Sequence, residues 1–402
     1  MLLDRRDLLK GVGALAAGAA RADFSGARAA FPWSETEVFL NNAGWHPIGV
    51  HSIRAMEKYL EYKSKGPGDD REDFGGAQQH AVKTLFARII NAKPSEIAFV
   101  QSTLVGENLV RQGLGIPQSG GNLVTDELHY EGSLYMYQSL KKQGLDVRIV
   151  KPRNWRIDIR DMEKVVDRNT RLVAISLVSY LNGYRHDAKA VTDLAHAHGA
   201  YVYADIIQAA GAVPIDVRAL GLDFCACSGY KWLMGDRGLG YLFVREELQG
   251  EVVKRTQYGD RQFREFHNHF LPYDTPGPDP VSWQPASGAG SYYEVGNISN
   301  IAAAAQSASL AYILNLGVEN ILAHAGRLTA RIRQELPRKG YPCITPENNP
   351  TPIVSFVVKD PEGTRHKLRR AGVTVKIEWH HMRVSPSVYN SDADVDKLLN
   401  AV

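Results

Sequence analysis

The chain has little cysteine, 3 residues in 402, and little net charge, because 47 Lys and Arg residues balance 44 Asp and Glu residues. Three thiols are too few for a disulfide framework or for a four-thiolate zinc or iron–sulfur site. The basic residues form no long block. Nucleic acid is therefore not an expected partner of this protein.

Long apolar runs are also absent, since no stretch approaches the roughly eighteen consecutive apolar residues that a membrane-spanning helix needs. What is present is an ordinary globular composition, 44% hydrophobic and 23% charged. Such a composition excludes disordered, collagen-like and coiled-coil chains. At roughly 100–200 residues per domain, the length corresponds to two or three domains.

The N-terminus has the features of an export signal. Arg5, Arg6 and Lys10 precede a weakly apolar run at residues 11–20, and Ala-Arg-Ala at 20–22 has the small-residue pattern of a cleavage site. Adjacent arginines resemble the twin-arginine type of signal. We therefore expect the twin-arginine (Tat) export machinery as a partner, and a periplasmic or otherwise exported protein.

Two details of this segment leave alternatives open. Asp4 stands where Ser or Thr is usual in a twin-arginine signal, and a second Ala-Arg-Ala at 27–29 leaves the cleavage point undecided. We take residues 1–22 as the signal. The other interpretation is an Ala-rich terminus that is never cleaved, in which case the protein is cytoplasmic.

After this leader, short apolar runs alternate with amphipathic stretches. The runs are Ile97–Val100, Leu123–Thr125, Val147–Val150, Leu172–Val178, Tyr201–Ala204, Phe224–Ala226 and Leu239–Val244. Most of them begin about 20–30 residues apart, which is the length of one βα unit. The pattern predicts an α/β fold in which helices cover both faces of a mostly parallel sheet.

The remaining patterns divide the chain. We expect an N-terminal segment at 31–60 that packs with a small domain, a large domain at 61–295 and a smaller α+β domain at 296–402. Residues 255–292 contain five prolines, at 272, 276, 278, 280 and 285, together with several aromatic residues. This composition predicts a long irregular loop, of the kind that is often functional.

Asp205 and Lys231 follow predicted strands, and the carboxyl ends of strands are where open α/β sheets bind ligands. Lys231 lies between Tyr230 and Trp232 with no acidic neighbour in sequence, so it is placed to lose a proton and form a Schiff base. A carboxylate at ~3 Å from a cationic ring nitrogen interacts by about 5 kcal/mol before desolvation. Pyridoxal phosphate (PLP) uses this pair of groups.

Several motifs in a fixed order resemble one family. They are Asp-x-x-Gln-Ala-x-Gly at 205–211, Leu-Gly-x-Asp-Phe at 220–224, Ser-Gly-x-Lys-Trp at 228–232, Phe-Leu-Asn-Asn-Ala-Gly at 39–44 and an Arg-x-Ser…Tyr-Asn close at 383–390. Together they resemble the class V aminotransferase family, the fold-type-I group that includes cysteine desulfurases and isopenicillin N epimerase-like enzymes. The resemblance covers nearly everything after the leader and implies a fold-type-I, PLP-dependent transferase fold.

The resemblance implies a role for each residue of the site. Lys231 would form the Schiff base and then move the proton at the substrate α-carbon. Asp205 would hold the pyridinium proton, and Gln208 would hydrogen-bond the phenolic oxygen of the ring. His129 matches the histidine that stacks on the cofactor.

Phosphate binding is implied for residues at two motifs. Ser102 and Thr103 open a helix whose backbone N–H groups would face the anion, and Ser228 matches a further ligand. Tyr230 stands where cysteine desulfurases have His. Asn297 occupies the position from which a neighbouring subunit reaches the phosphate, which implies a homodimer with a shared active site.

The substrate is expected to be a small amino compound held by Asn42 and Arg383. The guanidinium fork of Arg383 suits a carboxylate. The histidine pairs 267/269 and 380/381 have no organised carboxylate or thiolate partner in sequence, so no metal site is expected.

The absence of one cysteine reduces the number of reactions that the family resemblance allows. In the resembling desulfurases a mobile cysteine precedes the substrate-binding arginine, but residues 371–382 contain no cysteine, and Cys343 lies 383 − 343 = 40 residues before Arg383. This argues against persulfide chemistry. Epimerisation, transamination and β-elimination, including C–S cleavage, remain open.

Residues 179–184, Ser-Tyr-Leu-Asn-Gly-Tyr, favour the epimerase-like branch of the family. The alternative of a different class is a catalytically idle protein of the same fold that binds an amine or a peptide.

Overall fold

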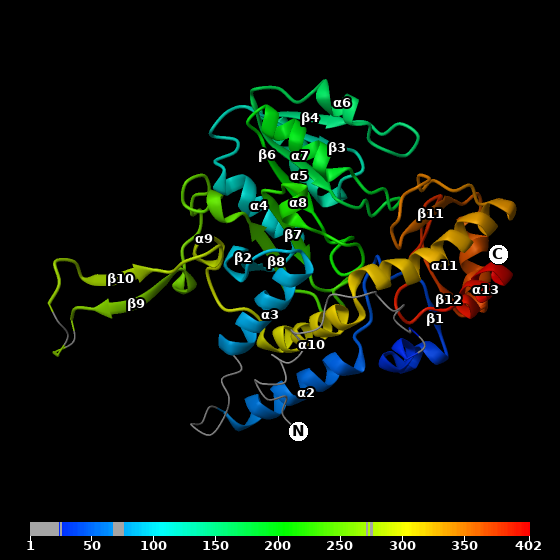
Figure 1. The fold of residues 1–402 in the computed structure, drawn as a ribbon, viewed down its shortest axis with the longest axis horizontal. Helices are drawn as coiled ribbons and strands as arrows, with labels where there is room; N and C mark the ends of the chain where they lie inside the picture. Colours follow the sequence, from blue (N-terminus) through cyan, green and yellow to red (C-terminus); the bar gives the residue numbers. More distant parts are fainter. Residues whose placement is uncertain (1–23, 25, 67–75, 271, 274–275) are drawn as a thin grey trace.

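The computed structural model describes residues 24, 26–66, 76–270, 272–273 and 276–402 (Figure 1). The predicted export signal at residues 1–22 lies outside the described residues.

A seven-stranded sheet forms the centre of the molecule, in the order β2-β8-β7-β6-β5-β3-β4. Every neighbouring pair of strands is parallel except the two pairs that include β8. The strands are β2 (Ile97–Val100), β3 (Asn122–Asp126), β4 (Asp146–Val150), β5 (Thr170–Ser176), β6 (Tyr201–Asp205), β7 (Phe224–Ser228) and β8 (Gly240–Val244). The predicted mostly parallel α/β sheet is confirmed.

Both faces of this sheet are buried, which explains its continuous apolar strands. In β6, Val202 and Ala204 lie in one core cluster and Tyr203 lies in the other. Figure 1 shows helices around the sheet. They include α3 (Gly76–Ile89), α7 (Ala188–Ala197) and α10 (Asn300–Leu316) against the first core, and α4 (Thr103–Gly113) and α5 (Glu131–Lys142) against the second.

A smaller α+β unit lies at the C-terminal side, coloured orange to red in Figure 1. Its strands are the antiparallel set β11 (Val354–Val357), β14 (His381–Val384) and β13 (Lys376–Glu378), and the parallel pair β1 (Val38–Phe39) and β12 (Val373–Thr374). Helices α11 (Val318–Arg338), α12 (Pro361–Arg370) and α13 (Asp392–Ala401) complete it. A third core, which includes Leu40, Leu328 and Phe356, holds this unit together.

The N-terminal segment connects the two units. Strand β1 belongs to the small unit, whereas helix α2 (Val50–Lys65) packs on α10. Because α10 also packs on α3, it belongs with the large unit. Helix α11 runs from one unit to the other, since Ile321 lies in the first core and Leu328 in the third. The domain limits drawn from the sequence stay a prediction.

The prediction of an irregular loop at 255–292 was wrong in its central part. Strands β9 (Phe263–Asn268) and β10 (Val281–Pro285) form an antiparallel hairpin, followed by the short helix α9 (Gly290–Tyr293). The hairpin projects away from the body of the molecule (Figure 1). Its strands are mostly exposed on both faces, so no alternation of apolar and polar residues marks them in the sequence.

Within the described residues, no single helix is long and apolar enough to cross a membrane. Helices α10 and α11 pass that test only when they are taken together, and they bend by 77° at their junction.

Candidate active site

Four polar residues end neighbouring strands at one edge of the large sheet. Asp126 ends β3, Ser176 ends β5, Asp205 ends β6 and Ser228 ends β7. Ser176 and Asp205 are partners in register. Lys231 follows Ser228 by three residues, so the predicted lysine and acid lie at the same edge, as parallel strands require.

Lys231 is a buried amine, with only 7% of its surface exposed. Burial lowers its pKa to about 8, Asp205 opposes that shift, and Arg383 adds to it. Its Nζ atom lies 5.7 Å from the centroid of the Tyr230 ring. At this pKa roughly a tenth of the amine is neutral at pH 7, far more than in an ordinary lysine, and the neutral amine is the nucleophile.

Asp205 is a buried carboxyl beside this lysine. Burial raises the pKa of Asp205 to about 6, while His129, the backbone N–H of Ile207 and Lys231 act in the opposite direction. A cationic ring nitrogen placed beside it would lower this pKa and so hold the carboxyl in its ionised form. Asp205 therefore suits a pyridinium partner.

Thr103 and Ser228 meet at the N-terminus of α4. The backbone N–H of Thr103 donates to Ser228 Oγ at 2.9 Å, and the N–H of Ser228 donates to Thr103 Oγ1 at 2.9 Å. Ser102 caps the helix by accepting from the N–H of Val105 at 3.2 Å. Two hydroxyls thus stand at a helix N-terminus, which is a favourable place for a phosphate.

His129 is completely buried and both of its ring nitrogens contact protein groups. Nδ1 lies 2.8 Å from Ser176 Oγ, and Nε2 lies 3.0 Å from Glu107 Oε1. Glu107 also accepts from Ser133 Oγ at 2.5 Å and from the hydroxyl of Tyr137. Sequence reasoning predicted His129 but missed Glu107 and Ser176.

Gln208 and Asn42 are also buried, but much of their hydrogen-bonding capacity is used within the protein. Gln208 donates to the carbonyl of Ala43 and accepts from the indole N–H of Trp232, both at 2.9 Å. Asn42 donates to the carbonyl of Ser385 at 2.9 Å and accepts from the hydroxyl of Tyr389 at 2.6 Å. One amide hydrogen of each side chain remains for a ligand.

Arg383 lies on β14 and is buried, yet it contacts no carboxylate among the described residues. Nη1 donates to the carbonyl of Tyr180 at 2.8 Å, and Nη2 donates to Asn41 Oδ1 at 3.2 Å. Its Nε makes no hydrogen bond within the described part of the chain. Burial lowers its pKa to about 10. A buried cation of this kind favours an anionic ligand.

Within the described residues, no hydrogen bond joins Asn297 to this cluster. It is exposed, and Nη1 of Arg261 approaches its side-chain oxygen at 3.5 Å. The predicted contact from Asn297 to a partner's phosphate stays a prediction.

The segment before Arg383 is a tight hairpin and not a loop. Strands β13 and β14 pair directly, Glu378 with His381, across the two-residue turn Trp379–His380. Cys343 does not lie in this hairpin. Its backbone forms an isolated antiparallel β-bridge with Phe356 of β11 in the small unit.

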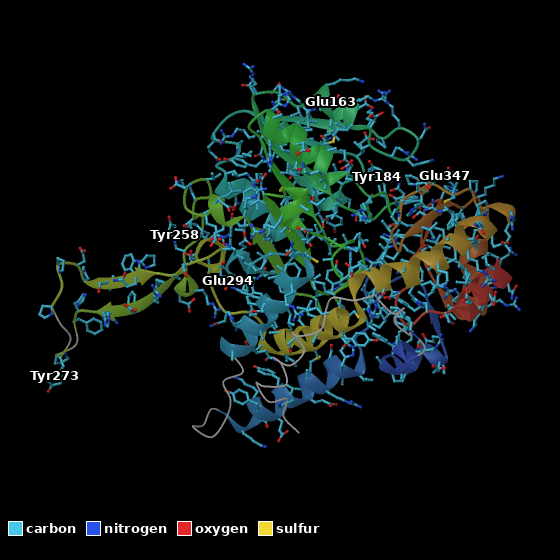
Figure 2. All side chains as sticks on the ribbon, viewed as in Figure 1. Glu163, Tyr184, Tyr258, Tyr273, Glu294 and Glu347 are labelled. Carbon is cyan, nitrogen blue, oxygen red and sulfur yellow. The ribbon has the colours of Figure 1, made fainter. Side chains whose placement is uncertain are left out.

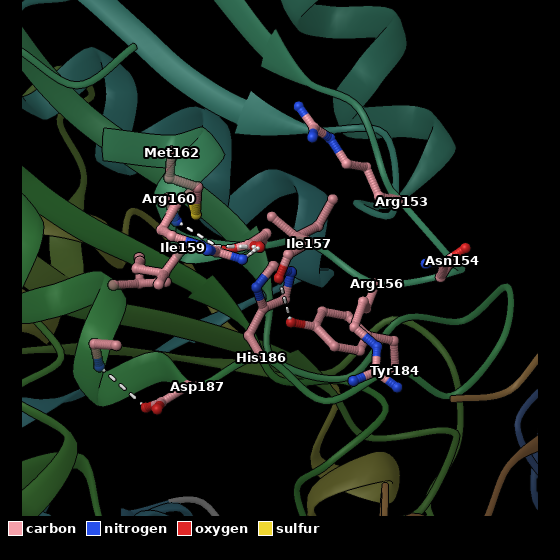
Figure 3. A pocket seen from close by; sticks show the side chains of 13 residues that line it. Arg153, Asn154, Arg156, Ile157, Ile159, Arg160, Met162, Tyr184, His186 and Asp187 are labelled. Atoms are coloured by element: carbon pink, nitrogen blue, oxygen red, sulfur yellow. Dashed lines mark hydrogen bonds and ion pairs between the residues drawn. The ribbon is translucent and has the colours of Figure 1, made fainter. Parts of the chain in front are cut away.

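A separate cavity of about 480 Å³ lies between the segment after β4 and the segment before α7 (Figure 3). Tyr184 donates to the carbonyl of Ile157 at 2.8 Å there, and His186 lies 3.3 Å from Asp126. Arginines 153, 156 and 160 line this cavity, and none of the predicted site residues does. The described residues contain no group of three or more His, Cys, Asp or Glu that could hold a metal ion.

The residues at the sheet edge fit PLP. A buried lysine with a lowered pKa, a buried acid and a pair of hydroxyls at a helix N-terminus provide one group each for the aldehyde, the ring nitrogen and the phosphate. Fold and site therefore define a fold-type-I enzyme that uses pyridoxal 5'-phosphate.

The chain belongs to the class-V aminotransferase family, whose model matches residues 38–398. A probable cysteine desulfurase of Methanothermobacter thermautotrophicus is 26% identical over 361 residues, which cover 88% of this chain and 86% of that protein. An uncharacterized aminotransferase of Schizosaccharomyces pombe is 26% identical and covers 92% of each chain.

Solved structures show the same fold. The apo cysteine desulfurase of Thermococcus onnurineus NA1 superposes with a TM-score of 0.82 at 24% identity, covering 96% of this chain and 98% of that one. The cystine C–S lyase C-DES, in complex with cysteine persulfide, superposes with a TM-score of 0.78 at 22% identity, covering 92% and 98%. A variant of C-DES carries glycine linked covalently to its PLP cofactor.

Proposed function

We propose that this PLP-dependent enzyme acts at the α-carbon of an amino acid or peptide-like amine, as an epimerase or an aminotransferase, and that it is exported. The observation that supports this proposal best is the pair formed by Lys231 and Arg383. The first is a buried amine with a lowered pKa, and the second is a buried guanidinium without a carboxylate partner among the described residues. A base and a carboxylate anchor are what a reaction at an amino acid's α-carbon requires.

Each residue has a defined task in this proposal. When bound, PLP supplies the electron sink that makes an α-carbon proton acidic. Arg383 binds the substrate carboxylate and orients the α-carbon, and Lys231 Nζ removes the α-proton and returns it. Asp205 holds a proton on the ring nitrogen, and Thr103 and Ser228 fix the phosphate.

The absence of a cysteine in the segment before Arg383 supports this proposal over a persulfide route. The residues between β13 and Arg383 contain no cysteine, and the two-residue turn leaves no loop to hold one. A β-elimination that cleaves a C–S bond needs only the α-carbon base. The likeness to desulfurases and to a cystine C–S lyase favours this second candidate.

The test is an amino-acid panel offered to the holoenzyme in D₂O. Deuterium at the α-carbon with loss of chirality supports epimerisation, whereas a keto acid with the cofactor in its amine form supports transamination. Pyruvate with sulfide or a thiol identifies the lyase. A holoenzyme that exchanges no α-proton in any substrate is the idle binding protein, and the proposal fails.

The proposal includes a homodimer. Hairpin β9–β10 exposes large aromatic side chains, among them Phe270 at 74% and Trp283 at 54%. Tyr258 lies near its base and Tyr273 at its tip (Figure 2), and both are largely exposed, at 82% and 100%. An isolated two-stranded hairpin is at best marginally stable in water. A second copy that covers it would also bring Asn297 toward a neighbouring phosphate site.

Export is proposed from the paired Arg5 and Arg6. The full chain, expressed in a bacterium, should appear in the periplasmic fraction shortened at its N-terminus. Replacing Arg5 and Arg6 together with Lys should retain it in the cytoplasm. A full-length cytoplasmic wild-type chain would contradict this part of the proposal.

A further inference from the structure

Glu107 is a buried carboxylate whose hydrogen-bonding contacts lie within the protein. It lies on α4, is 1% exposed, and is surrounded by the ring of His129 and the hydroxyls of Ser133 and Tyr137. An ionised carboxylate only accepts hydrogen bonds. Two hydroxyls donate to this one, and the third neighbour, Nε2 of His129, donates to it when that nitrogen carries a proton. The arrangement therefore fits a buried anion whose cationic neighbour is His129.

His129 has no ring nitrogen left for a substrate. Its Nε2 is directed at Glu107 and its Nδ1 at Ser176. A base must lie within hydrogen-bond reach of the proton that it removes. Both edges of the ring that could do so are instead occupied by α4 and by the end of β5.

We propose that Glu107 is a positioning residue that keeps His129 doubly protonated and fixed in place, so that His129 covers the cofactor site as a cation and, of these two residues, Lys231 is the base at the α-carbon. This inference rests on the proposed function, because a base matters only where an α-proton is removed. The state of His129 is nevertheless a property of the protein itself.

The charges around the ring support this state. Burial by itself lowers the pKa of His129, but the charge and hydrogen bond of Glu107 raise it, with further contributions from Asp205 and Asp126, and the net shift is upward. The groups that face the ring come from α4, β3, β5, β6 and α5, with Ser176 at the end of β5 and Tyr137 on α5, whose ring centroid lies 6.2 Å from that of His129. The charged groups that raise the pKa of His129 are Glu107, Asp205 and Asp126, and all three are acidic.

The charge state can be measured without substrate or cofactor. In the full chain labelled with ¹⁵N-histidine, the two ring nitrogens of an imidazolium resonate close together, and those of a neutral ring lie far apart. His129→Gln identifies the resonances of His129 among the 13 histidines. We expect the imidazolium pattern of His129 to persist to higher pH than in an exposed histidine, whose midpoint is about 6.5.

Glu107→Gln keeps the size of the side chain and removes its charge. We expect His129 to lose its second proton at lower pH in this variant than in the wild type. Ser133→Ala is the matched control, because it removes a donor to the same carboxylate and keeps the charge. There the imidazolium pattern should be unchanged.

Two results would overturn the inference. One is a neutral His129 in the wild type near pH 7, which decides the question even if Glu107→Gln does not fold. The other is an unchanged titration in Glu107→Gln. Failure of the proposed function would be seen in the other experiment. A holoenzyme that exchanges no α-proton for deuterium would contradict the proposed function, whereas the ¹⁵N-histidine titration of His129 would still follow our expectation.

Discussion

The guanidinium of Arg383 donates from Nη1 to the backbone carbonyl of Tyr180 at 2.8 Å. The contact joins β14 of the small unit to the segment after β5 of the large one. It aligns the guanidinium, yet it leaves the positive charge uncompensated, because a carbonyl carries no net charge. A substrate carboxylate would supply the missing anion.

Arg383→Gln should therefore weaken substrates that carry an α-carboxylate. Hydrogen bonds to charged groups contribute about 1.5–3 kcal/mol each, so we expect kcat/KM to fall about 10- to 150-fold, mainly through KM. The measurement is steady-state kinetics on the substrate found with the panel. An analogue that lacks the carboxylate is the control, and an equal loss for that analogue would rule out the anchoring role.

Covalent attachment of the cofactor should depend on pH through Lys231. Its folded-state pKa of about 8 lies below its ordinary value of 10.5, and only the neutral amine attacks an aldehyde. The rate at which cofactor-free protein acquires the visible absorbance band of bound PLP should rise with pH and level off above about 8. Lys231→Ala should show no such band.

Two substitutions should move, in opposite directions, the pH at which this attachment rate is half of its maximum. Asp205→Asn removes the anion that raises the pKa of Lys231, so the midpoint should fall. Arg383→Gln removes a cation that lowers the pKa, so the midpoint should rise. Stopped-flow absorbance across a pH series gives both values. A midpoint that neither variant moves would show that these charges do not act on Lys231.

The protonation of Lys231 also links pH to stability. Its folded pKa is below its unfolded one, so its contribution to the stability of the cofactor-free protein is full above pH 10.5 and is lost as pH falls to about 8. The contribution of Asp205 to stability changes with pH in the opposite direction. Its folded pKa of about 6 lies above 3.8, so its contribution is full below 3.8 and is lost as pH rises through about 6.

Much of the large unit could be predicted from the sequence because its strands are buried on both faces. Their continuous apolar runs are visible without a structure, and polar residues such as Asp205 and Ser228 follow them directly. Ser176 ends β5 in the same way, so the rule that found Asp205 applies to it equally.

Other parts of the site left no pattern to detect. Glu107 is charged and lies in the middle of a helix, where such residues normally face solvent. It is buried by tertiary packing against His129 and against Ser133 and Tyr137 of α5. Tyr180 contacts Arg383 through its backbone carbonyl, which any residue could provide. Hairpin β9–β10 is held by backbone pairing between strands that face solvent.

The core of the large unit gives a prediction of stability. Phe86 on α3 is fully buried and stacks on Tyr241 of β8, with ring centroids 4.1 Å apart and planes at 11°. Phe86→Ala should destabilise the protein by about 3–5 kcal/mol, because it loses the buried ring and leaves a cavity. Tyr135→Ala is the control, since Tyr135 is 77% exposed and should change stability by less than about 0.5 kcal/mol. Urea unfolding of both variants compares the two effects.

The exposed hairpin gives a prediction about assembly. If a second copy covers β9 and β10, Trp283→Glu should place a charge in that interface and increase the fraction of monomer in sedimentation measurements. The matched control is Trp155→Glu, because Trp155 is similarly exposed, at 51% against 54% for Trp283, but lies far from the hairpin in sequence. Because Asn297 is expected to reach the partner's phosphate, the monomeric fraction should also retain PLP less well. A wild-type chain that sediments as a monomer, or a dimer that Trp283→Glu does not weaken, would contradict this interface.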